Sequence, residues 1–141
     1  MDEPTWVSRV VVDAMHTNQL QEHGGLQGTR DVNVLASALG RPQHKYAYEP
    51  DVEIATLAAA YVFGLATSHP YIDGNKRTAF VTGAVFLDQN GYDIDRSEQE
   101  VVETMLAVAD RRLNEAELAA WIRSSLVPLP PPPTADTVPS L

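Results

Sequence analysis

The 141-residue chain contains no cysteine, which excludes both a disulfide framework and a thiolate metal site. Long hydrophobic runs are also missing. The longest strongly apolar stretch, near residues 55–66, is shorter than the roughly 20 residues that span a membrane. The first four residues, Met-Asp-Glu-Pro, are acidic, whereas a secretory signal peptide begins with basic residues. These absences predict a cytoplasmic protein without a membrane partner.

Positive charge is scarce. The ten lysines and arginines are outnumbered by nineteen aspartates and glutamates, which gives a net charge of −9 at pH 7. A surface this acidic repels phosphate backbones, so we expect no direct binding of nucleic acid. A nucleotide would need a locally basic site, whereas a protein with a basic segment would be attracted.

The spacing of apolar residues predicts an all-α fold, one compact domain of about six helices around a central buried helix. The helices are expected to begin near residues 4, 31, 51, 75, 97 and 114. A loop is expected at residues 44–50, and residues 92–94 are a candidate for a short extended segment. The fourth helix, residues 75–90, is apolar nearly all round after its first turn, which favours a place in the middle of the core.

The domain is expected to span residues 1–126, because the composition changes after that point. Residues 127–141 hold six of the ten prolines, and proline lacks the backbone N–H that a helix needs. We therefore expect a polyproline-like or disordered extension there.

Residues 69–78 concentrate chemically active groups in one short segment, which reads His-Pro-Tyr-Ile-Asp-Gly-Asn-Lys-Arg-Thr. The segment leads into a predicted helix, whose first N–H groups have no partner and carry partial positive charge. Gly74 lets a ligand approach the backbone closely, and Asn75 is a candidate helix cap or ligand contact. Lys76 and Arg77 add positive charge to a helix end that disfavours it, which indicates a bound anion such as a nucleotide phosphate.

His69 and Asp73 fit different roles in the same segment. An imidazole exchanges protons readily near neutral pH, so His69 is a candidate general base. Asp73 is a candidate ligand for magnesium, which commonly binds one or two carboxylates together with phosphates. Pro70 is expected to hold His69 in an extended conformation, and the ring of Tyr71 is expected to anchor the loop in the core.

The other three histidines show no spacing typical of a metal site. We expect each of them to be a surface residue or part of the local structure: His16, His23 and His44.

Residues 69–79 resemble the signature of the Fic/Doc (Fido) family, in which His-Pro-Phe, one variable residue and an acidic residue lead into Gly-Asn. Lys-Arg-Thr-Ala at residues 76–79 agrees with the Doc (death-on-curing) toxin branch, and Tyr71 replaces the usual phenylalanine. Several segments between residues 23 and 42 also resemble that branch. The likeness therefore covers residues 5–126.

This resemblance implies a toxin of a type II toxin–antitoxin system, a kinase that moves the terminal phosphate of ATP to a serine or threonine hydroxyl. The implied target is translation elongation factor Tu, whose modification blocks translation. His69 would be the base, Asp73 would hold Mg²⁺, and the phosphates would be bound by the residues that follow: Gly74, Asn75, Lys76 and Arg77.

Two departures from the signature separate this chain from relatives that transfer AMP. Those relatives have a glycine where Lys76 stands and a second arginine where Phe80 stands. Both features help them to hold the far phosphates of ATP, so their loss favours transfer of the terminal phosphate. The alternatives are a protein adenylyltransferase and a non-catalytic binding module with the same fold.

The family resemblance also implies two contacts with other proteins. The chain lacks the inhibitory pattern of Ser or Thr, three residues, Glu, then Gly or Asn. Inhibition of the toxin would then come from a small Phd-like antitoxin that folds on binding. This predicts a hydrophobic groove on the domain, where the antitoxin binds. By family analogy, residues 44–48 would align an extended target peptide by strand addition.

Overall fold

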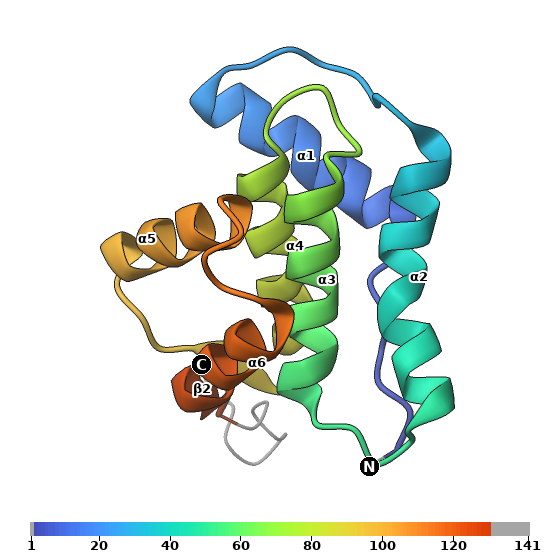
Figure 1. Cartoon of the computed structure of the whole chain (residues 1–141), viewed down its shortest axis with the longest axis vertical. Coiled ribbons are helices and arrows are strands. Elements are labelled where there is room, and N and C mark those ends of the chain that lie inside the picture. Colours follow the sequence, from blue (N-terminus) through green and yellow to red (C-terminus); the bar gives the residue numbers. More distant parts are fainter. Residues whose placement is uncertain (1, 131–141) are drawn as a thin grey trace, which may run out of the picture.

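The computed structural model describes residues 2–130, and this part of the chain forms six helices and two short strands. The elements are α1 (Arg9–His23), α2 (Val32–Tyr48), α3 (Ile54–Ser68), α4 (Asn75–Gln89), β1 (Tyr92–Ile94), α5 (Glu98–Ala109), α6 (Glu115–Ser125) and β2 (Leu126–Pro128). Figure 1 shows α3 in the middle, with α2 on one side, α5 and α6 on the other, and α1 across the upper end. The prediction of an all-α domain is confirmed.

The central helix is α3, in which eleven of fifteen residues are buried. It packs against α2, α4, α5 and α6. Five residues of α3 are alanines and one is a glycine. Because these side chains are small, neighbouring helices can pack close to the α3 backbone from several sides. At Gly83, α4 approaches α3 so closely that a Cβ atom would overlap the side chain of Val62.

The prediction that the fourth helix lies in the middle of the core is wrong, because α4 has two different faces. One face is buried: Thr78, Ala79, Thr82, Gly83, Phe86 and Leu87. The opposite face is only partly buried and lines a surface groove: Phe80, Val81 and Ala84. The apolar composition of α4 therefore reflects a core face and a groove face on the same helix.

The helix α2 continues past the expected stop at residues 40–42 and ends only at Tyr48. The expected loop at residues 44–50 is therefore wrong, and so is the assignment of residues 44–48 to strand addition. Pro42 removes one helical hydrogen bond, but it is buried in the interface with the core. Two cations flanking it, Arg41 and Lys45, both pair with Glu115 of α6, which stabilises the second half of the helix.

Two helices begin later than expected. The first helix, α1, begins at Arg9, where the Ser8 side chain accepts a hydrogen bond from the Val11 N–H. Residues 2–8 instead run without regular structure, and the Val7 N–H donates to the hydroxyl of Tyr61 over 3.1 Å. The third helix begins at Ile54 and not directly after Asp51.

The C-terminal third agrees closely with its local signals. Ser97 and Glu100 form a capping box before α5, and Asn114 and Glu117 form one before α6. The extended segment expected at residues 92–94 is β1, which pairs with β2 in an antiparallel register. Val127 and Pro128, assigned from the sequence to the extension, thus belong to a strand.

Most of the proline-rich extension, residues 131–141, lies outside the described residues. None of the helices between residues 2 and 130 has the length and apolar character required to cross a membrane.

Candidate functional site

The loop that connects α3 to α4 carries the predicted active residues at one end of the molecule (Figure 1). His69 directly follows the last residue of α3, and Gly74 directly precedes the first residue of α4. Gly74 adopts a left-handed conformation (φ 77°), which glycine allows without strain. The loop thereby places the C-terminus of one helix and the N-terminus of the next side by side.

His69 adopts a left-handed conformation, with φ 51° and ψ 59°. The expectation that Pro70 would hold it in an extended conformation is therefore wrong. The left-handed residue ends α3 and turns the chain, so that Pro70 and Tyr71 enter the core while His69 stays exposed. Such a conformation is uncommon for a residue with a side chain, and costs on the order of 1–3 kcal/mol.

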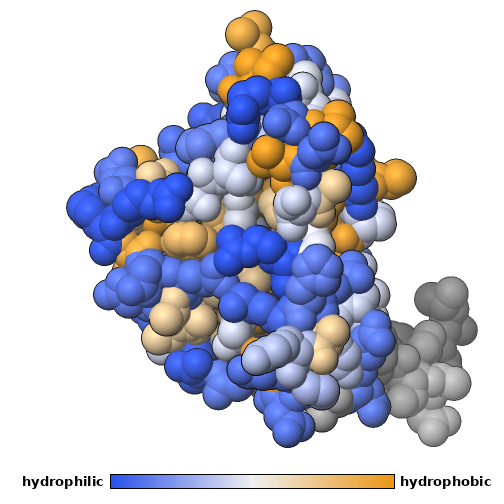
Figure 2. All heavy atoms as spheres, turned by 45° about the vertical axis from the view of Figure 1, so that its right-hand side comes forward, coloured by the Kyte–Doolittle hydropathy of each residue, from blue (hydrophilic) through white to orange (hydrophobic). Residues whose placement is uncertain are grey.

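The segment between α1 and α2 lies beside this loop and holds it by its backbone. The N–H of Arg30 donates to the carbonyl of Pro70 over 2.8 Å, and the N–H of Ile72 donates to the carbonyl of Gly28 over 3.0 Å. Exposed hydrophobic side chains on both segments include Leu26 and Ile72. Figure 2 shows hydrophobic residues gathered at the upper end of the molecule, where Figure 1 places both segments.

Tyr71 anchors the loop in the core, as predicted. Its ring is buried and stacks on the ring of His16 with 3.7 Å between the centroids. Its hydroxyl donates to Oδ1 of Asp13 over 2.7 Å. Burial, followed by the hydrogen bond to Asp13, raises the pKa of Tyr71 well above its ordinary value, so the hydroxyl keeps its proton.

His16 is a buried part of the site that the sequence interpretation missed. Only 3% of its surface is exposed, and its Nε2 lies 2.8 Å from the carbonyl oxygen of Asp73. Because a carbonyl can only accept, Nε2 must carry the proton. The available signal was spacing: Val12, His16 and Leu20 recur every four residues, and all three are buried on one face of α1.

Asp73 is held against the segment between α1 and α2. Its Oδ2 accepts a hydrogen bond from the Leu26 N–H over 2.7 Å. A Cβ atom at Gly25 would lie 3.2 Å from Cβ of Asp73 and 2.8 Å from Leu20, so a glycine is needed there. Within residues 2–130, Oδ1 of Asp73 has no hydrogen-bond partner, which leaves one carboxylate oxygen for a ligand.

The described residues contain no cluster of three histidine, aspartate or glutamate side chains that could hold a metal. A cation at Asp73 would therefore take most of its ligands from water and from phosphate oxygens. This is the usual arrangement for Mg²⁺ bound to a nucleotide, so the single free carboxylate oxygen fits that ion.

A polar cavity of about 400 Å³ lies at the N-terminus of α4. Its lining includes five of the predicted residues: Asp73, Gly74, Asn75, Lys76 and Arg77. His69 is not part of this lining. Lys76 and Arg77 are exposed and form no salt bridge within the part of the chain that the structure describes. Two unpaired cations and a helix N-terminus make this cavity suited to an anion.

Asn75 braces the loop instead of capping the helix. Its Oδ1 accepts from the Tyr71 N–H over 3.0 Å, and its Nδ2 donates to the Tyr71 carbonyl over 2.9 Å. Both polar atoms of the side chain are thereby engaged, and Gly74 occupies the cap position. The side chain therefore shapes the loop, whereas the backbone of Asn75 begins the first turn of α4.

A second, larger cavity of about 670 Å³ opens beside the first, between α4, α5 and β1. Both cavities share His23, Lys76 and Arg77 in their linings. The walls are mostly apolar: Phe80, Val81, Ala84, Ile94, Val101, Val102, Met105 and Leu106. This apolar groove is of the kind expected from the sequence, and α5 presents half-exposed Val102 and Leu106 to it.

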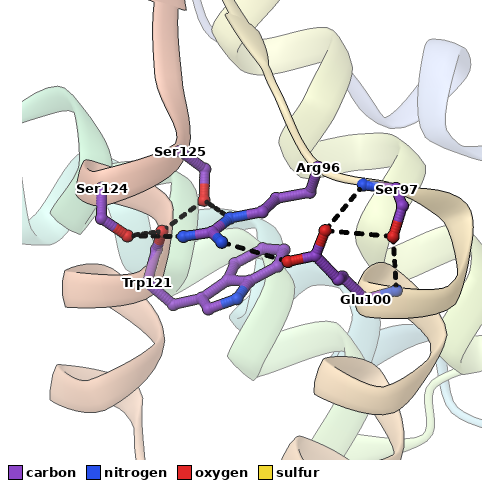
Figure 3. Close-up of polar contacts among 6 residues, drawn as sticks. All are labelled: Arg96, Ser97, Glu100, Trp121, Ser124 and Ser125. Atoms are coloured by element: carbon purple, nitrogen blue, oxygen red, sulfur yellow. Dashed lines mark hydrogen bonds and ion pairs between the residues drawn. The ribbon is translucent and has the colours of Figure 1, made fainter.

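Arg96 fixes the α5 wall of the apolar groove to α6 (Figure 3). Its guanidinium donates to the hydroxyls of Ser125 (2.6 Å) and Ser124 (2.9 Å), and pairs with Glu100 (3.1 Å). It also lies over the ring of Trp121. Hydrogen bonds from the backbone and hydroxyl of Ser97, with that from Arg96, lower the pKa of Glu100 and keep this carboxylate charged.

Comparison with known proteins points to one family. A model of the Fic/DOC family matches residues 6–87, which include α1, α2, α3 and the loop that carries His69. The protein kinase doc of Escherichia phage P1 is 29% identical over 110 residues, which cover 78% of this chain and 86% of that protein. Toxin Doc of Mycolicibacterium smegmatis (strain ATCC 700084 / mc(2)155) is 35% identical over 105 residues, or 70% of this chain and 81% of that protein.

Proposed function

The chain belongs to the Fic/Doc family, and from this premise we propose that it is a toxin of a type II toxin–antitoxin system that acts as a kinase. It would transfer the terminal phosphate of ATP to a serine or threonine hydroxyl of a cytoplasmic protein. The observation that carries the proposal is the anion-binding cavity at the N-terminus of α4, with Asp73, Lys76 and Arg77 in its lining. The names of two relatives, a kinase and a toxin, support the same reading.

The cavity offers what phosphoryl transfer requires, which is mainly positioning and neutralisation of charge. The first N–H groups of α4 and the side chains of Lys76 and Arg77 would bind the phosphate oxygens. Gly74 adds no side chain at the point where the phosphates approach the backbone. Asp73 would hold Mg²⁺, which when bound neutralises charge on the phosphates.

His69 would act as the general base from the opposite end of the same loop. Its imidazole accepts the proton of the target hydroxyl while the hydroxyl oxygen bonds to the terminal phosphorus. The bond between that phosphorus and the bridging oxygen breaks, and ADP leaves with its electrons. Because His69 is exposed and outside the lining of the cavity, the target segment would lie between His69 and the phosphates.

The groove face of α4 supports phosphate transfer over AMP transfer. Phe80 stands where the adenylylating members of the family carry a second arginine, and it lies in the apolar lining beside Lys76. A phenylalanine cannot bind a phosphate, so this side of the cavity is poorly suited to the far phosphates of ATP. The nucleotide would then place its terminal phosphate, and not its α phosphate, near His69.

A labelling experiment tests the proposal directly. The purified chain is incubated with elongation factor Tu, the proposed target, and with ATP labelled at either the terminal or the α phosphate. We expect label on the target from the terminal phosphate only, and a serine/threonine phosphatase should remove it. Label from the α phosphate alone would establish AMP transfer instead, and no label on any protein would favour a binding module.

We further propose that a Phd-like antitoxin occupies the apolar groove. Val102 is half-exposed on the groove wall, so Val102→Asp should leave the fold intact but bury an unpaired charge in the complex. Titration calorimetry with the antitoxin should show an affinity loss of about tenfold or more, which is at least about 1.4 kcal/mol. Val10→Asp, at an exposed position outside the groove lining, is the matched control. Equal losses in both variants would contradict the placement.

A further inference from the structure

We infer that Arg30 is a positioning residue for the proposed reaction: its guanidinium fixes the left-handed backbone of His69 and so presents the imidazole to the target. The inference rests on the proposed function, because His69 must be the base for its presentation to affect the rate. Arg30 belongs to the segment between α1 and α2, and it is exposed. Its side chain contacts residues 68 and 69, which are 38 and 39 positions away in the sequence.

Two hydrogen bonds connect the Arg30 side chain to the end of α3. Nε donates to the carbonyl of His69 over 2.6 Å, and Nη2 donates to the carbonyl of Ser68 over 2.8 Å. Carbonyls at a helix C-terminus have no helical N–H to bind, and the helix dipole favours a positive charge beside them. The guanidinium therefore satisfies two backbone acceptors and places its charge at the negative end of α3.

The two carbonyls are those that define the conformation of His69. The Ser68 carbonyl belongs to the peptide plane before His69, and the His69 carbonyl belongs to the plane after it. The φ and ψ angles of His69 are the rotations between these two planes. A rigid planar guanidinium that binds both carbonyls therefore restrains φ and ψ together.

His69 needs this restraint, because it adopts a backbone conformation that residues with side chains rarely adopt. Its φ of 51° lies in the left-handed region, and the following proline adds a further restriction. Such a conformation persists when surrounding contacts hold it. Without the guanidinium, the imidazole would be distributed over several directions, and fewer molecules would present it correctly at any moment.

The Arg30 backbone is anchored independently of its side chain. Its N–H and that of Asp31 both donate to the Pro70 carbonyl, over 2.8 and 3.2 Å. Asp31 also caps α2 by accepting from the N–H groups of Asn33 and Val34. Replacement of the Arg30 side chain therefore leaves the path of both loops in place and releases only the peptide planes around His69.

The experiment compares Arg30→Ala and Arg30→Lys with Arg112→Ala, in the full chain, by phosphate transfer from ATP. Arg112 is an exposed arginine after α5 and serves as the matched control. We expect Arg30→Ala to lower kcat roughly 10- to 100-fold, the range for misplacement of a reacting group. KM for ATP should change less than about twofold, because phosphate binding is assigned to Lys76 and Arg77.

Arg30→Lys should remain close to Arg30→Ala, since an ammonium keeps the charge but lacks the planar two-donor geometry. Added guanidinium ion should restore part of kcat in Arg30→Ala and in neither other variant. A purely structural role would not produce this split between kcat and KM or this rescue. An unchanged kcat in Arg30→Ala, or a rise in KM that equals the fall in kcat, would overturn the inference.

A conformational measurement separates this inference from the proposed function. Labelling the four histidines with ¹³C reports the backbone conformation of His69 through its Cα chemical shift. That shift should move in Arg30→Ala and stay in place in Arg112→Ala. If the wild-type chain transfers no phosphate but the shift moves as expected, the proposed function fails while the hold of Arg30 on His69 stands. A shift that does not move overturns the inference.

Discussion

Replacement of His69 by asparagine is expected to reduce phosphate transfer roughly 10²- to 10⁴-fold, the range that a general base contributes. Asparagine cannot accept the hydroxyl proton, but it tolerates the left-handed backbone that this position requires. The variant therefore removes the base without disturbing the turn after α3. Alanine would confound the two effects, since it is less tolerant of a positive φ.

Initial rates with ATP labelled at the terminal phosphate give the measurement, and calorimetry gives the affinity for ATP. Affinity should stay near that of the wild type, because His69 does not line the cavity at the N-terminus of α4. His44→Asn, at an exposed histidine of α2, is the matched control and should retain the full rate. If His69→Asn kept most of its activity, the base would have to be another group.

Replacement of Phe86 by alanine is expected to cost about 3–5 kcal/mol of unfolding free energy. Phe86 is fully buried, and its ring lies 5.0 Å from that of Tyr61 and 5.8 Å from that of Trp6. Since a domain of this size is stable by about 5–15 kcal/mol in total, the variant should come close to unfolding. The loss arises from the transfer of the ring out of the core and from the cavity left behind.

Phe80→Ala is the matched control, because it makes the same change on the groove face of the same helix. Phe80 is only partly buried, so the expected cost is about 1 kcal/mol, although the shape of the groove would change. Urea unfolding followed by circular dichroism measures both values. Equal losses would mean that both faces of α4 are packed in the core, as its apolar composition alone suggested.

Features that depend on neighbouring residues were predictable from the sequence. The capping boxes at Ser97 and Asn114 form as expected because each involves residues only three positions apart. The short strand at residues 92–94 was also expected, although its partner β2 was not. Local signals are sufficient where the competing interactions are local as well.

Features that depend on contacts between residues far apart in the sequence were not predictable in this way. The stop at Pro42 is a sound local prediction, yet α2 continues to Tyr48. Pro42 is buried, and Arg41 and Lys45 on either side of it pair with Glu115, which lies 74 and 70 residues away in the sequence. Likewise, hydrophobicity alone does not distinguish a central helix from one whose second face lines a groove. Small side chains allow α3 to be surrounded by other helices, which makes it the central helix. The placement of α5 leaves a groove beside α4, so the second face of α4 is only partly buried.

For the loop that connects α3 to α4, the sequence by itself determined which chemical groups are present and that a helix N-terminus lies among them. It could do so because His69, Asp73, Lys76 and Arg77 fall within nine consecutive residues. Only the tertiary structure decided the backbone conformation of His69 and the hydrogen bonds that fix Asp73. Those answers depend on Arg30, 39 residues before His69, and on His16, 57 residues before Asp73. Such contacts form when separate helices pack together, and no local pattern encodes that packing.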